Sequence, residues 1–170
     1  MANFNDGCLE QAASFMQRGW YIDALAILRG GVDQLFDDRE YDKYFEYARQ
    51  VGRCLYLMGN YEDALLAYYT VFQFIRTNRK NNINEIELIV NSMCYDFAPE
   101  IGYTLAAAAD SRLYSASFAD AIKSGDEDYN KEKFLNVGFE WAQQIIKNEP
   151  DERMLEIAFK NIMHIDVSFR

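Results

Sequence analysis

The chain has 170 residues, half of them apolar and 15% of them aromatic. A chain of this size and composition can bury a large core, so we expect a single compact domain and exclude intrinsic disorder. The 27 acidic residues outnumber the 17 basic ones and give a net charge of -10, which is the wrong sign for binding nucleic acid or an anionic membrane surface. Only two prolines and nine glycines occur, and this scarcity of helix-breaking residues favours an all-α fold.

The N-terminal residues have neither a basic region nor an apolar run, so we expect no secretory signal. Apolar runs elsewhere are far shorter than the roughly 20 residues that span a bilayer. Three cysteines, Cys8, Cys54 and Cys94, are widely spaced and odd in number, which argues against a disulfide framework or a zinc site. We predict reduced thiols in the cytoplasm, with Cys54 and Cys94 in the core.

A seven-residue motif occurs twice in the first half of the chain, from Gly19 to Leu25 and from Gly59 to Leu65, with five identical positions. Each position has a physical reason. Glycine ends a helix in the left-handed conformation, the tyrosine that follows packs into the bend, and alanine lets two helices cross closely. The motif therefore predicts two helix–turn–helix joints.

The motif and its flanking residues resemble the tetratricopeptide repeat (TPR), whose signature places small and aromatic residues at fixed steps around a turn glycine. The second copy matches at Gly52, Tyr56, Gly59, Tyr61, Ala64 and Tyr68, and the first copy has Ala12, Met16, Gly19, Tyr21, Ala24 and Leu28 at the same places. The resemblance implies a right-handed superhelix of about three antiparallel helix pairs with a C-terminal capping helix. Its first repeat would cover about 5–36 and its second about 45–78, within one domain that spans 1–170.

The second half of the chain is expected to continue this architecture with diverged helices over 84–148. Apolar spacing predicts one helix over 85–95 and a long helix from Ile101 to Ile122, with Pro99 in its first turn. A polar break follows at 125–128, and further expected helices are one over 134–146, stopped by Pro150, and a capping helix over 151–166.

No constellation in the sequence is typical of a catalytic or metal site. His164 is the only histidine and has no nucleophile at a recognisable spacing. The residues Asp126, Asp128 and Asn130 match the start of a calcium loop, but Lys131 and Val137 stand where that loop needs glycine and glutamate. We expect no enzyme activity, no cofactor and no metal ion.

Arg49, Arg53 and Tyr56 share one helical face. By the resemblance, these three residues and Glu46 would line the concave groove of a TPR protein and contact a bound peptide, with the arginines suited to carboxylates. The alternative is that both arginines form ion pairs within the chain, either with Glu46 or with the acidic residues of 37–40.

The predicted function is non-catalytic protein–protein interaction, as an adaptor or small chaperone that binds a protein or peptide partner in that groove. One alternative is an acidic inhibitor or immunity-type protein that blocks a basic site on its partner. Others are a structural subunit of a larger assembly and an enzyme with an unfamiliar carboxylate site. Homodimerisation through the last helices is a further hypothesis.

Overall fold

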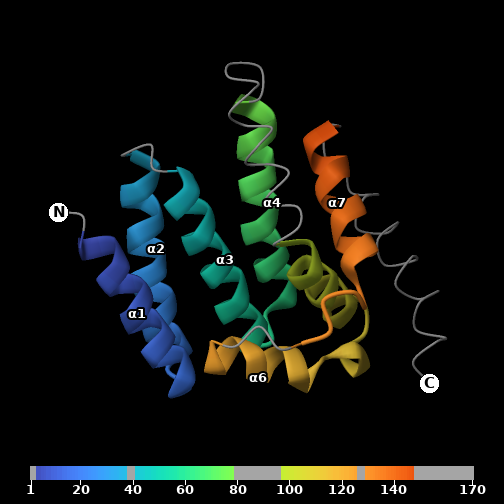
Figure 1. Cartoon of the computed structure of the whole chain (residues 1–170), viewed down its shortest axis with the longest axis horizontal. Helices are drawn as coiled ribbons and strands as arrows, with labels where there is room; N and C mark the ends of the chain where they lie inside the picture. Colours follow the sequence, from blue (N-terminus) through green and yellow to red (C-terminus); the bar gives the residue numbers. More distant parts are fainter. Residues whose placement is uncertain (1–2, 38–40, 79–96, 126–128, 148–170) are drawn as a thin grey trace. The chain divides into compact units, whose positions relative to one another are not determined.

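The computed structural model describes residues 3–37, 41–78, 97–125 and 129–147, and every regular element within these ranges is a helix (Figure 1). The predicted all-α class is thereby confirmed for the described part of the chain. None of the helices in these ranges has the length and apolar character needed to cross a membrane. The predicted helices over 85–95 and 151–166 lie outside the described residues.

The chain divides into two compact units, one formed by Met1–Ala67 with Ala116–Tyr129 and one formed by Tyr68–Ser115 with Asn130–Arg170. The prediction that they act as one domain stays a prediction. The described helices of the first unit are α1 (Asn3–Gln17), α2 (Tyr21–Asp37), α3 (Tyr41–Leu57), the start of α4 (Tyr61–Asn78) and α6 (Ala116–Ser124). In this unit α2 packs against both α1 and α3.

The two predicted turns are confirmed and have the same backbone geometry. Gly19 and Gly59 adopt φ values of 78° and 80°. Each glycine N–H donates to the carbonyl three residues earlier, over 3.1 and 3.0 Å, and the next N–H donates to the carbonyl five residues earlier, over 2.8 and 2.9 Å. This pair of bonds defines the Schellman motif, which satisfies the last carbonyls of a helix. The repeated sequence therefore encodes a repeated helix ending.

The two copies of the motif also have the same pattern of buried residues. Four of the six matching positions are buried in both copies: Ala12, Met16, Ala24 and Leu28 in the first copy, and Gly52, Tyr56, Ala64 and Tyr68 in the second. The predicted packing of tyrosine into the bend is seen at the second joint, where the rings of Tyr56 and Tyr61 lie 5.3 Å apart. At the first joint, Phe15 and Trp20 make a ring contact of 5.7 Å instead.

Contact between α2 and α3 depends on a glycine that faces an aromatic ring. Tyr47 of α3 is fully buried, and its ring occupies the place that a side chain at Gly31 of α2 would take. An aromatic residue and a glycine thus fit together where two larger residues would collide.

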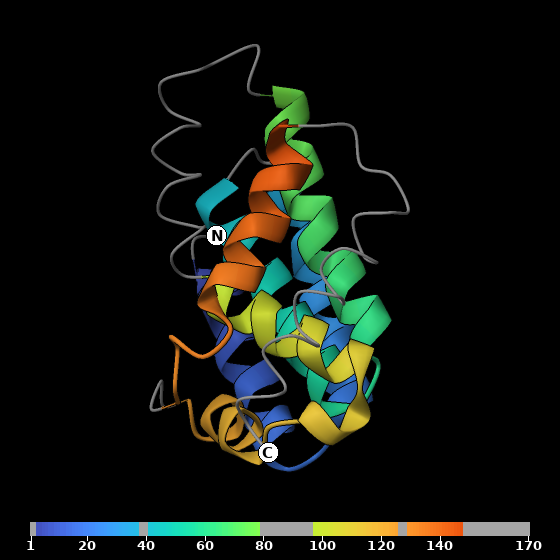
Figure 2. The same ribbon diagram turned by 90° about the vertical axis from the view of Figure 1, so that its right-hand side faces the viewer.

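The second unit contains the helical residues 97–109, the 3-10 turn η1 (Ser111–Leu113) and α7 (Leu135–Lys147). Helix 97–109 and α7 lie side by side (Figure 2) and approach so closely that a Cβ at Gly138 would overlap the carbonyl oxygen of Ala98. A Cβ at Gly102 would overlap the carbonyl oxygen of Phe134 in the same way. At both glycines the partner is backbone, which side-chain rotation cannot move away.

Aromatic contacts complete the described core of the second unit. Phe97 makes edge contacts with Tyr68 and Phe72, at 5.9 and 6.2 Å between ring centroids. Tyr103 packs edge-on against Phe134 at 5.0 Å, and its hydroxyl donates to the carbonyl of Asn130 over 2.6 Å. The two contacts of Tyr103 fix the loop before α7 to helix 97–109.

The prediction of one long helix from Ile101 to Ile122 is wrong. The helix ends at residue 109, and Asp110 adopts an extended conformation with φ of -153°. Its carboxylate accepts from the backbone N–H of Arg112 over 2.9 Å and binds the guanidinium of the same residue. Aspartate favours such local bonds over a continuing helix, so alanine-rich flanks do not carry the helix through this point. The polar break after α6 is confirmed at Gly125, which has φ of 72°.

Candidate interaction surface on the first unit

Helix α6 belongs to the first unit although it follows helix 97–109 of the second unit in sequence. It contacts α1 and α3, the first helices of the two joints, and lies toward the ends that precede Gly19 and Gly59 (Figure 1). We call this side of α1 and α3, which includes Tyr56, the α6-binding face.

Phe118 anchors α6 on this face. Its side chain is fully buried, and its ring packs edge-on against Tyr56 with 4.9 Å between centroids. The ring of Tyr129 also packs against Phe118, with 4.9 Å between centroids. Ala119, Ala121 and Ile122 are the other buried residues of α6. The helix is amphipathic, with Asp120 and Lys123 exposed to solvent.

Docking accounts for the helicity of α6. The helix has nine residues, whereas isolated helices shorter than about 12 to 15 residues are marginal in water even when rich in alanine. Its stability must therefore come from burying Phe118 and its neighbours against α1 and α3. The α6-binding face is thus a surface that holds a short amphipathic helix.

The four predicted partner-binding residues form one stripe along α3, and its exposure falls toward the C-terminal end of that helix. The Glu46 side chain is 42% exposed and that of Arg49 12% exposed. Arg53 is buried, and Tyr56 is entirely enclosed. The open end of the stripe is therefore polar, and the closed end lies under α6.

The open end carries an ion pair within α3. Arg49 Nη1 lies 3.7 Å from Glu46 Oε2, and Gln50 Nε2 donates to Glu46 Oε1 over 3.0 Å. The alternative of an intramolecular ion pair is thereby confirmed for Arg49 with Glu46. The partner-binding role of the stripe stays a prediction, and in this structure the neighbour of Tyr56 is Phe118 rather than solvent.

Cys54 has the predicted core position. Its thiol donates to the carbonyl of Tyr21 over 3.3 Å. Burial raises the pKa of this thiol to about 11, although the positive charge of Arg29 acts in the opposite direction. The thiol is therefore protonated at neutral pH and is a poor nucleophile. Cys8 is also a free thiol, and Cys94 lies outside the described residues.

Among the residues that the structure describes, no cluster of histidine, cysteine, aspartate or glutamate could hold a metal ion. The partial match to a calcium loop, rejected above on sequence grounds, falls on Asp126 and Asp128, outside the described residues, and on Asn130. The Asn130 side chain accepts from the N–H of Glu132 over 3.2 Å. His164 also lies outside the described residues.

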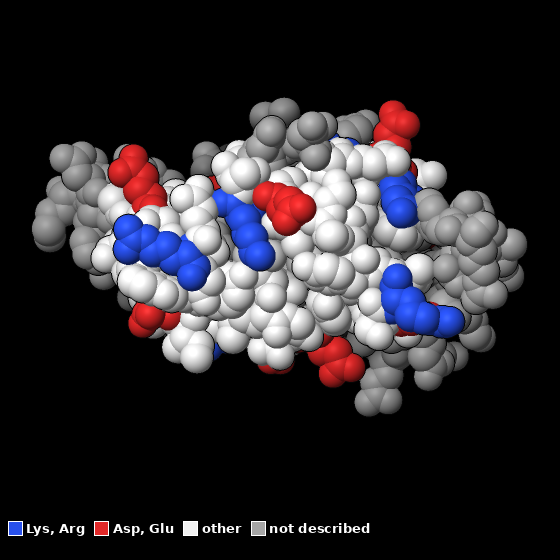
Figure 3. Space-filling model, turned by 90° about the horizontal axis from the view of Figure 1, so that it is seen from below, with Lys and Arg blue, Asp and Glu red and all other residues white. Residues whose placement is uncertain are grey.

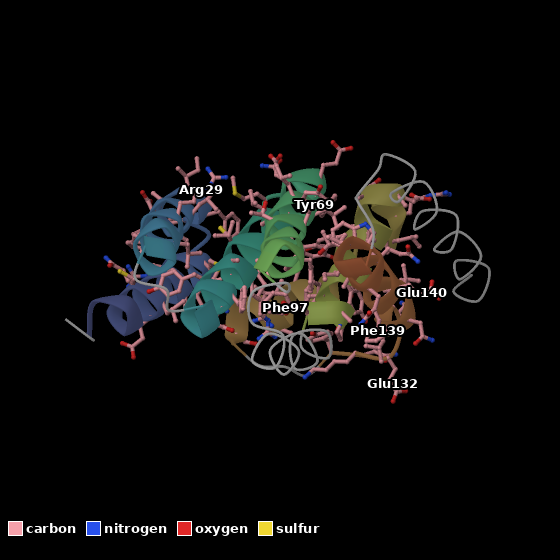
Figure 4. The ribbon with its side chains drawn as sticks, turned by 90° about the horizontal axis from the view of Figure 1, so that it is seen from above. Arg29, Tyr69, Phe97, Glu132, Phe139 and Glu140 are labelled. Carbon is pink, nitrogen blue, oxygen red and sulfur yellow. The ribbon has the colours of Figure 1, made fainter. Side chains whose placement is uncertain are left out.

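Charged side chains are interspersed on the surface. Figure 3 shows basic and acidic groups of the described residues mixed on the side that it presents. Exposed charges on other elements include Arg29 of α2 and, directed outward from the second unit, Glu132 and Glu140 (Figure 4).

Sequence reasoning did not identify Phe118 as the residue that contacts the predicted stripe. The only signal is the spacing of Phe118, Ala121 and Ile122, which marks an apolar helical face without naming its target. Comparisons with protein-family models, curated proteins and solved structures give no match for this chain. Its function is therefore inferred from its own residues and contacts.

Proposed function

We propose that this protein is a non-catalytic interaction module of TPR-like construction that binds a helical segment of a partner protein on α1 and α3. The observation that carries the proposal is the burial of Phe118 against Tyr56, because it demonstrates that this surface accepts an amphipathic helix through an aromatic anchor. Recognition of amphipathic helices by apolar surfaces is a common mode of protein binding.

The two helix–turn–helix joints support the TPR-like part of the proposal. Both turns have the same pair of backbone hydrogen bonds, and four of the six signature positions are buried in each copy. The polar end of the stripe supplies charged groups, Glu46 and Arg49, about two to three helical turns before Tyr56 on α3. Such a layout, an enclosed aromatic centre with a polar rim, is typical of protein interfaces. We further propose a cytoplasmic location, supported by the free thiols of Cys8 and Cys54.

Site-specific photo-crosslinking tests the proposal. The photoreactive residue benzoylphenylalanine replaces Glu46 on the stripe in one variant and Ile22 of α2, which is 76% exposed, in a matched control. Each variant is irradiated in native lysate, and the adducts are identified by mass spectrometry.

We expect one protein to be captured reproducibly through position 46 and not through position 22. Capture through position 22 alone would place the partner on another surface, as expected for an inhibitor that binds through its acidic exterior. Capture through neither position would reject the proposed surface.

A further inference from the structure

We infer that α6 is an internal competitor for the α6-binding face, and that the external partner is an amphipathic helix with an aromatic residue followed by apolar residues three and four positions later. This inference rests on the proposed function. It adds the chemistry of the partner and a means of regulation.

The partner's pattern follows from the contacts of α6. Phe118, Ala121 and Ile122 stand at positions i, i+3 and i+4, and all three are buried. Since residues at this spacing share one helical face, a partner helix that replaces α6 must present an aromatic ring to Tyr56 in the same way. Its solvent-facing positions, like Asp120 and Lys123 here, are open to polar residues.

The structure makes α6 suited to release. Tyr114, with φ of -55° and ψ of 132°, separates it from η1, and Gly125, with φ of 72°, ends it. Because the backbone is not helical at Tyr114 and turns at Gly125, α6 is not continuous with η1 and can detach as a separate segment.

The α6 helix also has a small set of buried residues compared with the helix that it covers. It buries four side chains, those of Phe118, Ala119, Ala121 and Ile122. By contrast, α3 buries Phe45, Tyr47, Ala48, Val51, Arg53, Cys54, Leu55 and Tyr56. Release of α6 therefore exposes fewer buried side chains than release of α3 would.

Occupation of the α6-binding face by α6 lowers the apparent affinity of every external ligand for that face. If the face is open for only about 1% of the time, the apparent dissociation constant rises about 100-fold. A partner therefore binds well only when it outcompetes a tethered helix whose local concentration is high.

Fluorescence anisotropy with a synthetic peptide tests this inference. The probe is a labelled peptide of residues 114–125, with blocked termini, and a second peptide carries Phe118→Ala. Each is titrated with the full-length protein and with a full-length Phe118→Ala variant, whose own α6 lacks the anchor.

We expect the Phe118→Ala protein to bind the unmodified peptide at least about tenfold more tightly than the parent protein does. The altered peptide should bind to neither protein. Asp120→Ala, an exposed substitution on the same helix, is the matched control and should leave the affinity at the parental level. Adding Tyr56→Leu to the Phe118→Ala protein should abolish the gain.

Circular dichroism establishes that the variants are folded. If Phe118→Ala does not fold, Ile122→Ala provides a milder release of α6 and should give a smaller gain in affinity. A folded variant that binds the peptide no better than the parent would overturn the inference. Crosslinking through position 46 decides the proposed function separately: capture there without a peptide gain would leave that function standing, and α6 would be a fixed part of the fold.

Discussion

Glycines bring helices together in both units, but they face different atoms. In the first unit, Gly31 of α2 faces the ring of Tyr47 on α3. In the second unit, Gly138 of α7 faces the carbonyl of Ala98, and Gly102 faces the carbonyl of Phe134. A ring can rotate or shift when a methyl group is added opposite it, whereas a carbonyl moves only with its helix. A methyl group added at the glycine can therefore be accommodated by a ring movement in the first unit, whereas in the second unit it must push the backbones apart.

The largest effect is expected from Gly138→Ala. Because the added methyl group would separate two helix backbones, we expect the free energy of unfolding to fall by about 3 kcal/mol. The chain has two tryptophans, of which Trp20 is half-exposed and Trp141 lies in α7. In a Trp20→Phe background, Trp141 fluorescence during urea unfolding reports on the second unit.

Asn136→Ala, an exposed change on the same helix, is the control and should alter stability by less than about 0.5 kcal/mol. Equal stabilities of Gly138→Ala and Asn136→Ala would show that the helices do not approach through this glycine.

A smaller loss is expected from Gly31→Ala, about 1 to 2 kcal/mol, because the Tyr47 ring can adjust. The neighbouring Gly30 has no atom within 4 Å of its added Cβ. Gly30→Ala should therefore stabilise the protein by about 0.5 kcal/mol, through helix propensity alone. Urea unfolding followed by circular dichroism measures both changes.

The ring contact at Gly31 can be tested further by a double-mutant cycle with Tyr47→Leu. Replacing the Tyr47 ring by the shorter leucine side chain should reduce the destabilisation caused by Gly31→Ala, with a coupling energy of about 1 kcal/mol. Additive losses would contradict the contact.

Substitutions at the two turn glycines should lower the free energy of unfolding by equal amounts, and by less than Gly138→Ala does. Gly19→Ala and Gly59→Ala each place a side chain in the left-handed region, so each should cost about 1 kcal/mol in free energy of unfolding. Asparagine at either position should cost less, because it tolerates this conformation. A loss at one turn and none at the other would break the equivalence of the two joints.

The prediction with the smallest effect at neutral pH is a pH dependence caused by Cys54, which appears only in alkaline solution. Its folded pKa is about 11 against an ordinary value of 9.0, so the unfolded chain loses the thiol proton first as pH rises. Stability from this group is fully present below pH 9.0 and is lost between pH 9.0 and about 11. Urea unfolding should show a shallower decline over this range for Cys54→Ala than for the parent protein.

Chemical labelling gives an independent measurement on the same thiol. At pH 8, iodoacetamide should modify Cys54 at least about tenfold more slowly than the half-buried Cys8, as read by peptide mass spectrometry. Comparable rates would contradict the burial of Cys54.

The sequence was most informative where it repeats. Gly19 and Gly59 each stand before a matching Tyr–x–Asp–Ala–Leu segment, and local chemistry suffices to predict a left-handed turn and the helix after it. Asp110 shows the opposite case. Apolar spacing continues through it, yet one carboxylate bond to the N–H of Arg112 ends the helical segment.

Longer-range features could not be predicted in this way. Gly102 and Gly138 are ordinary helix residues in the sequence, and only the crossing of their helices reveals their contacts. The stripe on α3 was predicted from helical periodicity. The packing of α6 over its Tyr56 end was not predicted, because no local pattern connects Tyr56 with Phe118. Pairing two distant amphipathic segments depends on tertiary structure.

The position of α6 in the chain has a consequence for synthesis. Phe118 is made roughly sixty residues after Tyr56, which at ribosomal rates corresponds to about 3 to 12 seconds. During that interval the earlier helices emerge with the aromatic surface around Tyr56 uncovered. The nascent chain therefore passes through a stage at which this surface is open to chaperones and to neighbouring proteins, before its own later segment closes it.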